Sequence, residues 1–420
     1  MGSALNLPQL VIVADAPDAL VPVCGISLLE RLLRIAQRMG FRSATVLSAT
    51  PEPIRAALAQ PSWARADLQV ELRNRDTSHI TAQQLPSNAD RVLVIPADTY
   101  CDPRLLRALI DCETSAAIHD SAPPDRLRPL LQNATQVTGG YFVGPALLDR
   151  ATRASLNPVA SLREELAAAR LTTIDVAAQS DYIVSTRRHV RPLWFPAPAP
   201  EHRRLAESFI LDTAQKGTLD IPARVHGPIE TFLVSRLCKT SITPNQLTLL
   251  TMLVSLTVIA QFATGLIWSG VITALIVGVL DGLDGKQARV TVQTTEIGEW
   301  EHELDYLLET SWWLALAYHF HATQQEPHAW WLVGSLIALD LSDRAGRGLV
   351  KRQIGRDLDD ATRFDQQVRL VGGRRNTFIW ILAIATLLFA APATGFVVLC
   401  WWGIATAVIH LTRELWICTT

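Results

Sequence analysis

The sequence lacks the features that mark secreted, disulfide-rich or nucleic-acid-binding proteins. It has only six cysteines among 420 residues and no CxxC pair, which indicates reduced thiols rather than a disulfide or zinc framework. A formal net charge of -2 provides no basic excess for nucleic acid. The N-terminus has no basic start followed by an apolar signal region, so we expect the first half to be cytoplasmic.

Long apolar runs are also missing from the first half, and this absence divides the chain. Hydrophobic residues make up 49% of the sequence, but the long apolar runs lie almost wholly after Gln246. We predict six membrane spans in this second half, at about 246–264, 268–283, 300–320, 327–345, 376–391 and 394–412. The sequence therefore predicts a multidomain protein in which an all-α membrane domain over residues 241–420 follows a cytoplasmic domain.

The first 195 residues alternate short apolar runs with amphipathic helical patterns. Strands are predicted at 10–14, 44–47 and 91–95, and helices at 27–39 and 103–110. This alternation predicts an α/β domain with a mostly parallel sheet over residues 1–195. A polar, proline-containing linker is predicted at 196–220. An amphipathic helix suited to the membrane interface is predicted at 221–240, with Ile229, Phe232, Leu233 and Leu237 on one face.

A charged stretch from Asp281 to Asp305 interrupts the apolar half between the second and third predicted spans. It reads DGLDGKQARVTVQTTEIGEWEHELD, with six acidic residues before Asp305. Charges at the edge of a bilayer are costly unless they pair or bind an ion, so this stretch is the main functional candidate. Asp281 and Asp284 share one helical face, and Glu301 and Asp305 share a face of the next helix. Four carboxylates from two helices suit one or two hard divalent cations.

The residues between these carboxylates suit a phosphorylated ligand. Gly285 leaves the backbone uncovered, so that a phosphate or sugar can approach closely. Arg289 follows one turn later with a charge that suits a phosphate. The plainer interpretation, acidic residues that cap two helix ends, does not explain why the charges cluster so closely.

This pattern resembles the signature of the CDP-alcohol phosphotransferase (CDP-alcohol phosphatidyltransferase) family of integral membrane enzymes, which is DxxDGxxAR, eight residues, then GxxxDxxxD. The positions that match in type and spacing are Asp281, Asp284, Gly285, Ala288, Arg289 and Gly298. Strict counting from Gly298 places His302 and Tyr306 at the last two Asp positions. A shift of one residue gives Glu301 and Asp305 instead, and we prefer it because such a change is easily absorbed where a loop enters a helix.

The resemblance implies a transferase that uses Mg²⁺ or Mn²⁺, with two ions expected. An acceptor hydroxyl attacks the β-phosphorus of a CDP-linked alcohol, CMP leaves and a phosphodiester forms, as in phospholipid or polyol-phosphate synthesis. The metal ligands implied are Asp281, Asp284, Glu301 and Asp305. The CDP moiety would lie against Asp281, Gly285, Ala288 and Arg289. Asp305 is the candidate general base, whereas His302 is either a hydrogen-bond partner or a bystander.

A basic segment from Arg344 to Arg375 has two interpretations. It sets the topology and contacts anionic lipid headgroups, or it binds a phosphate on the acceptor, with Arg374 and Arg375 best placed for this. Asp340 and Asp343 are candidate structural partners of the arginines that follow them on the same predicted helix.

The order of elements in the first domain, with VLVIPADTYCD and later GGYFVG, resembles the sugar-phosphate nucleotidyltransferase fold. Such a domain precedes the membrane domain in bifunctional inositol-phosphate cytidylyltransferase/phosphotransferase fusions. The glycine-rich loop that would hold a nucleotide triphosphate is missing, because Asp15-Ala16-Pro17-Asp18 stands in its place and Ile26 replaces the usual lysine. Asp98 remains as a lone candidate metal ligand. We expect this domain to be inactive and to serve in folding, dimerisation or regulation.

Three functional alternatives stay open. The first is a phosphotransferase whose donor is either a CDP-diacylglycerol, used with a polar acceptor, or a CDP-polyol, joined to a phosphorylated polyol or lipid. A second possibility is a bifunctional enzyme whose first domain still makes the CDP-alcohol. The third is a non-catalytic membrane scaffold with a decayed site. The resemblance implies a homodimer in a bacterial or archaeal cytoplasmic membrane.

The distribution of basic residues predicts the orientation. Arg236 and Lys239 precede the first span, and Lys286 and Arg289 lie between the second and third spans. The turns at 265–270, 324–328 and 391–395 carry no Arg or Lys. By the positive-inside rule, both termini and the charged stretch face the cytoplasm. Cysteines introduced in the 265–270, 324–328 and 391–395 turns should then be labelled from the outer side, and cysteines near Gln287 from the cytoplasm. The reverse labelling pattern would overturn the orientation and the span count.

Overall fold

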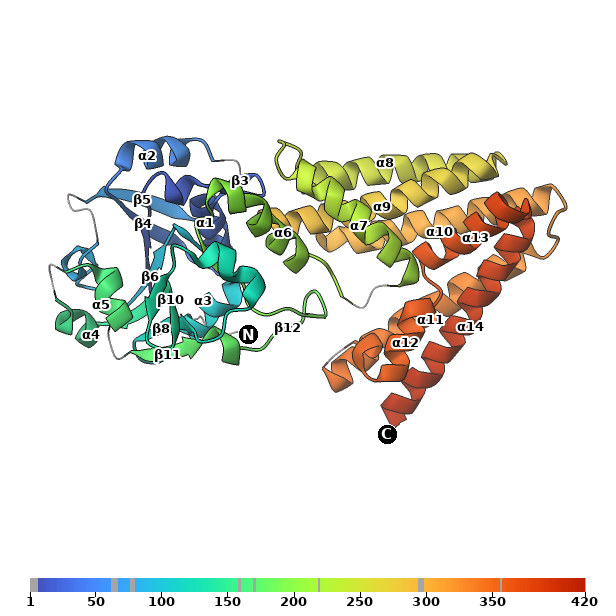
Figure 1. Cartoon of the computed structure of the whole chain (residues 1–420). Coiled ribbons are helices and arrows are strands. Elements are labelled where there is room, and N and C mark those ends of the chain that lie inside the picture. The colour runs from blue at the N-terminus through green and yellow to red at the C-terminus, as the bar shows by residue number, and fades with distance from the viewer. Residues whose placement is uncertain are drawn as a thin grey trace. The chain divides into compact units, whose positions relative to one another are not determined.

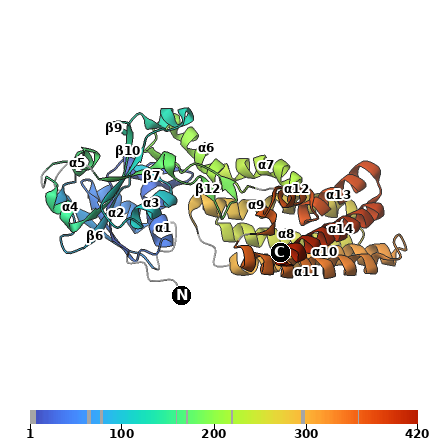
Figure 2. The ribbon, with the colours of Figure 1, turned by 90° about the horizontal axis from the view of Figure 1, so that it is seen from below.

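The structure is a computed structural model that describes residues 7–61, 67–75, 80–157, 160–168, 171–217, 220–293, 298–355 and 357–419, with side chains from Leu304 onward in the helix that begins at Gly298. It separates into two compact units (Figures 1 and 2). The front unit comprises Met1–Ala214, Cys238–Thr240 and Arg289–Gln293. The helical unit comprises Gln215–Leu237, Ser241–Ala288 and Thr294–Thr420.

An eight-stranded mixed sheet organises the described part of the front unit, in the order β11-β8-β10-β6-β1-β4-β5, with β9 beside β10. Its strands are β1 (Gln9–Val13), β4 (Ser43–Ser48), β5 (Gln69–Asn74), β6 (Arg91–Pro96), β8 (Ala116–Asp120), β9 (Thr135–Val137), β10 (Gly140–Asp149) and β11 (Thr172–Asp175). The run from β6 to β5 is parallel, and β10 is antiparallel to both of its long neighbours.

Alternation along the central strands gives the sheet two buried faces. Val11, Val92 and Val94 pack with Leu162 and Leu166 in one core. The intervening side chains point to the opposite face because successive strand residues alternate, and they are also buried. Burial on both faces explains why the sequence shows continuous apolar runs here rather than alternating polarity. The predicted mostly parallel α/β domain is confirmed.

Helices and short ribbons surround this sheet (Figure 1). The helices are α1 (Leu28–Arg38), α2 (Pro51–Ala59), α3 (Pro103–Ile110), α4 (Arg150–Ser155), α5 (Leu162–Ala168) and α6 (Arg203–Thr213). The ribbons are β2 (Pro22–Val23) with β3 (Ile26–Ser27), β7 (Thr99–Cys101) with β14 (Trp194–Pro196), and β12 (Tyr182–Ile183) with β13 (Arg188–His189).

The segment predicted as a polar linker, 196–220, differs from that expectation. Helix α6 occupies its middle and buries Ala206, Phe209 and Ile210. These three residues are spaced i, i+3, i+4, so they form one apolar face. The charged residues at the start of the segment concealed this short amphipathic pattern.

The helical unit consists, within its described residues, of α7 (Ile221–Leu237), α8 (Pro244–Ala263), α9 (Ile267–Thr291), α10 (Gly298–Ala322), α11 (Ala329–Ile354), α12 (Arg363–Val371), α13 (Arg375–Phe389) and α14 (Pro392–Thr419). Trp313 of α10 packs edge-on against Phe378 of α13, with ring centroids 5.5 Å apart. Phe320 of α10 meets Phe396 of α14 at 5.4 Å. These aromatic pairs lie in one continuous apolar core.

The outward faces of several of these helices are apolar as well. Leu253 of α8, Ile272 of α9 and Phe389 of α13 are among the large hydrophobic side chains exposed on the helical unit. A helix that is apolar on both its core-facing side and its outward side suits the hydrocarbon interior of a membrane. The helical unit therefore has the surface of a membrane domain.

A helix occurs at each of the six predicted spans, but the count of six crossings is not confirmed. By length and hydropathy, three helices among the described residues are able to cross a membrane, Pro244–Ala263, Ile267–Thr291 and Pro392–Thr419. Arg375–Phe389 is apolar but shorter. Helices α10 and α11 are long enough to cross a membrane, but they carry more charged residues. Both helices contribute side chains to a polar pocket.

Helix α7 covers most of the predicted interfacial helix. Ile221, Val225, Ile229 and Phe232 recur every three to four residues and are 47–60% exposed. His226 and Val234 are buried on the opposite side. The exposed apolar stripe fits the interface, and its contact with lipid stays a prediction.

Asp120, at the end of β8, generates a stability prediction. Its carboxylate is fully buried and accepts hydrogen bonds from Trp194 Nε1 at 2.6 Å and Arg191 Nη2 at 2.5 Å. Replacing it by Ala leaves the arginine charge without its partner, which should cost about 3–5 kcal/mol of unfolding free energy. The exposed Asp125–Arg128 pair provides the control, because Asp125→Ala should cost less than about 1 kcal/mol. Urea unfolding of the full chain measures both costs, with proteolytic cleavage of the front unit as the signal of unfolding. Equal costs would contradict this account.

Candidate active site

Two glycines on α9 allow α7 to approach closely just before the charged stretch. A Cβ at Gly278 would lie 3.0 Å from the His226 ring, and one at Gly282 would collide with the Glu230 carboxylate. The glycines are four residues apart, as are the two α7 side chains that cover them, so the two faces match. This contact fixes the helix that carries Asp281.

Asp284 is held from α8. It is 4% exposed, and Thr248 Oγ1 donates a hydrogen bond to its Oδ2 at 2.6 Å. The next turn is anchored as well, because Lys286 Nζ donates to Thr231 Oγ1 and Gln287 Nε2 to the Ile242 carbonyl, both at 2.5 Å. The polar end of α9 is therefore tied to the residues around it by side-chain hydrogen bonds.

Two of the four predicted carboxylate ligands, Asp281 and Asp305, come into contact. Asp305 of α10 lies against Asp281, and Asp284 also contributes to its electrostatic surroundings. The guanidinium of Arg375 forms an ion pair with Asp281. Glu301 and the alternative ligand His302 lie outside the described side chains, as does Gly298. Among the side chains that the structure describes, no three of His, Cys, Asp or Glu converge closely enough to hold a metal ion.

The residues predicted to contact CDP lie one turn beyond Asp284. Gly285 and Ala288 are half-buried. Arg289 Nε donates a hydrogen bond to the carbonyl of Ala214 at 2.7 Å. The roles of these residues toward a nucleotide stay predictions.

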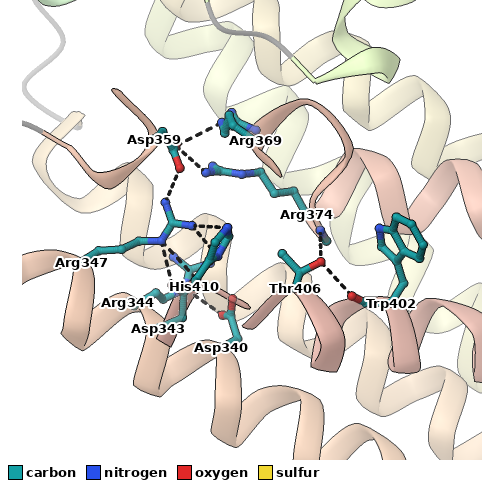
Figure 3. Close-up of polar contacts among 11 residues, drawn as sticks. Asp340, Asp343, Arg344, Arg347, Asp359, Arg369, Arg374, Trp402, Thr406 and His410 are labelled. Carbon is teal, nitrogen blue, oxygen red and sulfur yellow. Dashed lines mark hydrogen bonds and ion pairs between the residues drawn. The ribbon is translucent and has the colours of Figure 1, made fainter. Parts of the chain in front are cut away.

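Asp305 opens onto a polar pocket of about 360 Å³. Tyr306 and Glu309 continue its wall along α10, and Arg374 and Arg375, the predicted acceptor-phosphate ligands, line it at the start of α13. Burial of so many charges requires pairing. The pocket wall is accordingly a set of carboxylate–guanidinium contacts (Figure 3).

The acidic residues of α11 pair with arginines one turn later. Arg344 Nε donates to Asp340 at 2.8 Å, and Arg347 Nε donates to Asp343 at 3.0 Å (Figure 3). The predicted structural role of Asp340 and Asp343 is confirmed. His410 of α14 accepts from Arg347 Nη2 at 2.8 Å, which fixes a second side of that guanidinium.

Asp359 is the hub of this network and was not singled out in the sequence. It lies in a single helical turn, η6 (Leu358–Asp360), between α11 and α12. Its carboxylate meets Arg347 at 2.8 Å, Arg369 at 3.2 Å and Arg374 at 2.7 Å (Figure 3). Sequence spacing gave no signal for this, since the partners lie up to fifteen residues away on different elements.

Comparison with known families agrees with this geometry. Residues 241–409 match the family model described as CDP-alcohol phosphatidyltransferase. Residues 241–409 are therefore a domain of this family. The predicted resemblance is thus confirmed, and the matched range contains the predicted carboxylates and all the lining residues of the pocket except Asp220.

A curated relative and two solved structures resemble parts of the chain. "Bifunctional IPC transferase and DIPP synthase" of Aquifex aeolicus (strain VF5) is 30% identical over 204 residues, 46% of this chain and 44% of the relative. The chain thus spans less than half of that relative's length. Phosphatidylinositol phosphate synthase (PgsA1) of Mycobacterium tuberculosis with CDP-DAG bound is 16% identical, with a TM-score of 0.35, over 46% of this chain and 94% of that chain. HddC from Yersinia pseudotuberculosis is 13% identical, with a TM-score of 0.34, over 48% of this chain and 100% of that chain.

A second pocket, of about 270 Å³, lies in the front unit ahead of the CDP-alcohol phosphatidyltransferase domain. Asp15 follows β1 and Asp98 follows β6, at the point where the strand order reverses. Such switch points are the usual ligand sites of open α/β sheets. Both carboxylates are already paired, Asp15 with Arg75 and Asp98 with Arg163 at 3.0 Å.

We expect this front pocket to have lost nucleotidyl transfer. Asp15 and Asp18 line it, and their charges would repel a triphosphate. Full-length protein supplied with CTP, Mg²⁺ and a polyol phosphate should therefore release no pyrophosphate above background in a coupled assay. Release that is abolished by Asp98→Ala would show that the pocket is an active nucleotidyltransferase.

Proposed function

We propose that this protein transfers a substituted phosphate from a CDP-linked alcohol to an acceptor hydroxyl, with release of CMP. The observation that supports the proposal is the contact of Asp305, which lines an arginine-rich pocket, with Asp281, three residues before Asp284 on α9. The family match over the same residues supports a transferase. The donor would enter from the side of Gly285 and Ala288, and the acceptor from the pocket.

The family depends on a divalent metal, and the chemistry of the predicted ligands suits such an ion. Asp281, Asp284 and Asp305 supply the hard oxygen donors that Mg²⁺ and Mn²⁺ prefer, and Glu301 is the fourth predicted ligand. When bound, the metal supplies charge neutralisation at the diphosphate and its leaving group. Thr248, through its hydrogen bond, keeps Asp284 in a fixed orientation.

The chain's own side chains account for the remaining steps. Asp305 faces the pocket, where a carboxylate is placed to accept the proton of the attacking hydroxyl. Arg374 and Arg375 present guanidinium groups at the same pocket, which suits an acceptor that carries a phosphate. A phosphorylated polyol is therefore favoured over a neutral acceptor. The printed name of the Aquifex relative, which pairs a transferase with a synthase, is compatible with a CDP-polyol donor.

The rival proposal is a membrane scaffold that has lost activity. Its support is the departure from the family signature at Glu301 and His302. The two proposals differ in one measurement, the release of CMP from CDP-alcohols. Purified protein incubated with CDP-diacylglycerol or CDP-inositol, a panel of acceptors and either metal should release CMP. No release with any combination would favour the scaffold.

Substitutions distinguish the two alignments of the signature. Asp305→Asn should lower turnover by about two or more orders of magnitude, because it removes the proposed base and a metal ligand. Glu301→Gln should weaken Mn²⁺ binding, measured by titration of the purified protein, and His302→Ala should do less. Asp357→Asn is the control, since that half-buried carboxylate lies outside the pocket lining and pairs with Lys351, so it should leave both quantities unchanged. Loss of activity in His302→Ala with a tolerated Glu301→Gln would establish strict counting from Gly298.

A further inference from the structure

The last residues of α9 belong to the front unit. The helix lies in the helical unit as far as Ala288, whereas Arg289–Gln293 is part of the front unit. The last carbonyl groups of any helix have no partner within that helix and must find other donors. Val290 and Thr291, at this end of α9, are both buried. Their carbonyl groups therefore need donors from the protein itself.

Two arginines of α1 supply these donors. Arg31 Nη1 donates a hydrogen bond to the Val290 carbonyl at 2.5 Å. Arg34 Nη1 donates one to the Thr291 carbonyl at 2.6 Å. The two arginines are three residues apart, on one face of α1, and each is 2% exposed. A positive charge is favourable at the C-terminal end of a helix, where the helix dipole is negative. The arginines therefore cap α9 through both hydrogen bonds and charge.

The other contacts of these arginines hold them in the same direction. Arg31 Nη2 donates to the Val23 carbonyl at 2.9 Å, and its guanidinium lies 5.9 Å from the centre of the Tyr100 ring. Arg34 forms an ion pair with Glu30, one turn earlier on α1. A buried charge is tolerated where its donors are engaged. The carbonyl groups of α9 thus help to satisfy the two arginines, as the arginines satisfy the end of α9.

The residue that follows the helix shows that this end is constrained. Val292 has a φ of 53°, in the left-handed region. A β-branched residue rarely adopts this conformation, which helix ends usually assign to glycine. Such a conformation persists only where surrounding contacts hold it in place. The hydrogen bonds from α1 to the two preceding carbonyl groups are contacts of this kind.

The turn that α1 caps carries two of the residues predicted to bind the donor. Ala288 and Arg289 directly precede Val290 in the chain. The ends of helices fray when they are not held, and a frayed turn would leave the Arg289 side chain without a fixed position. Arg289 Nε itself donates to the Ala214 carbonyl at 2.7 Å. The cap on α9 therefore acts on the donor side of the proposed active site.

We propose that Arg31 and Arg34 are positioning residues, which cap α9 and thereby hold Arg289 in place for the CDP-linked donor. This gives the front unit a role in phosphotransfer that needs no nucleotidyl transfer in its own pocket. The role toward the donor rests on the proposed function, whereas the cap is measurable without any ligand. The two arginines touch no substrate in this proposal, and they act through the last turn of α9.

The first test is amide hydrogen exchange of the purified full chain in detergent, without ligand or metal, read by mass spectrometry on peptides that cover 286–293. Arg31→Ala and Arg34→Ala each remove one hydrogen bond made by a charged group. Each should raise the exchange rate of the amides in this segment by about tenfold or more. Exchange that is the same as in wild type in both variants would overturn the cap.

Arg91→Ala is the matched control for this measurement. Arg91 Nη1 donates to the carbonyl groups of Ile110 and Cys112, at the C-terminal end of α3 in the same unit. Its removal should raise exchange at the end of α3 and leave the end of α9 within about twofold of wild type. Equal loss of protection at α9 in this control would also overturn the cap, because general loosening of the front unit would then explain the result.

CMP binding in the presence of Mg²⁺ tests the role toward the donor. Arg31→Ala and Arg34→Ala should raise the Kd for CMP and the KM for the CDP-alcohol by about threefold to tenfold. The KM for the acceptor should change by less than about twofold, a selectivity that general damage to the fold would not produce. Arg34→Lys keeps a charged donor at the end of α9, so it should recover part of the loss.

The possible outcomes separate the cap from the proposed function. Should the alanine variants fail to fold, Arg31→Lys and Arg34→Lys carry both tests, because lysine replaces the rigid fork of donors by a single ammonium group. A normal Kd for CMP in variants whose α9 end exchanges rapidly would overturn the role toward the donor. Wild-type protein that neither binds CMP nor releases it would refute the proposed function, and the exchange measurement would still decide the cap.

Discussion

Pairing between carboxylates and guanidinium groups is the constraint on which the helical unit depends. Its helices are apolar on both faces, yet α9, α10 and α11 carry acidic residues at the same end of the bundle. A buried charge without a partner costs several kcal/mol, whereas a paired and hydrogen-bonded one is tolerated. The arginines of α11, α12 and α13 meet this requirement, because Arg347, Arg369 and Arg375 each pair with an acidic side chain.

Such pairs contribute specificity more than stability. Replacement of a buried ion pair by apolar side chains is often neutral or stabilising, so a simpler bundle of this length needs none of them. A protein that keeps Asp359 among three arginines, and Asp281 against Arg375, therefore maintains charge for another purpose. Ligand binding at a place where water is scarce is such a purpose, because electrostatic attraction is stronger there.

Local patterns predicted the elements, and spacing along single helices predicted part of the site. Continuous apolar runs identified the central strands, and i, i+4 spacing correctly matched Asp340 and Asp343 with their arginines. Periodicity could not determine how many helices cross the membrane, since charged residues lower the hydropathy of α10 and α11. It also missed α6, where three apolar residues suffice for burial.

Contacts between distant elements were beyond such reasoning. Asp359 differs from its acidic neighbours only in where η6 places it, and nothing in the local sequence distinguishes its role from that of the half-buried Asp357. Thr248 is similar, because one hydroxyl among several on α8 reaches Asp284, thirty-six residues away. Both contacts depend on tertiary packing, and no periodic pattern in a single sequence indicates such packing.

Two of the pockets, one in each unit, are walled by carboxylates and guanidinium groups in different arrangements. In the front unit, Asp15 and Asp98 each engage one arginine, and Asp18 adds a further negative charge to the wall. In the helical unit, Asp359 engages three arginines, and two of these also meet Asp343 and Asp220. The front pocket therefore carries a negative excess that disfavours a triphosphate, whereas each of these arginines in the helical pocket has a partner of opposite sign.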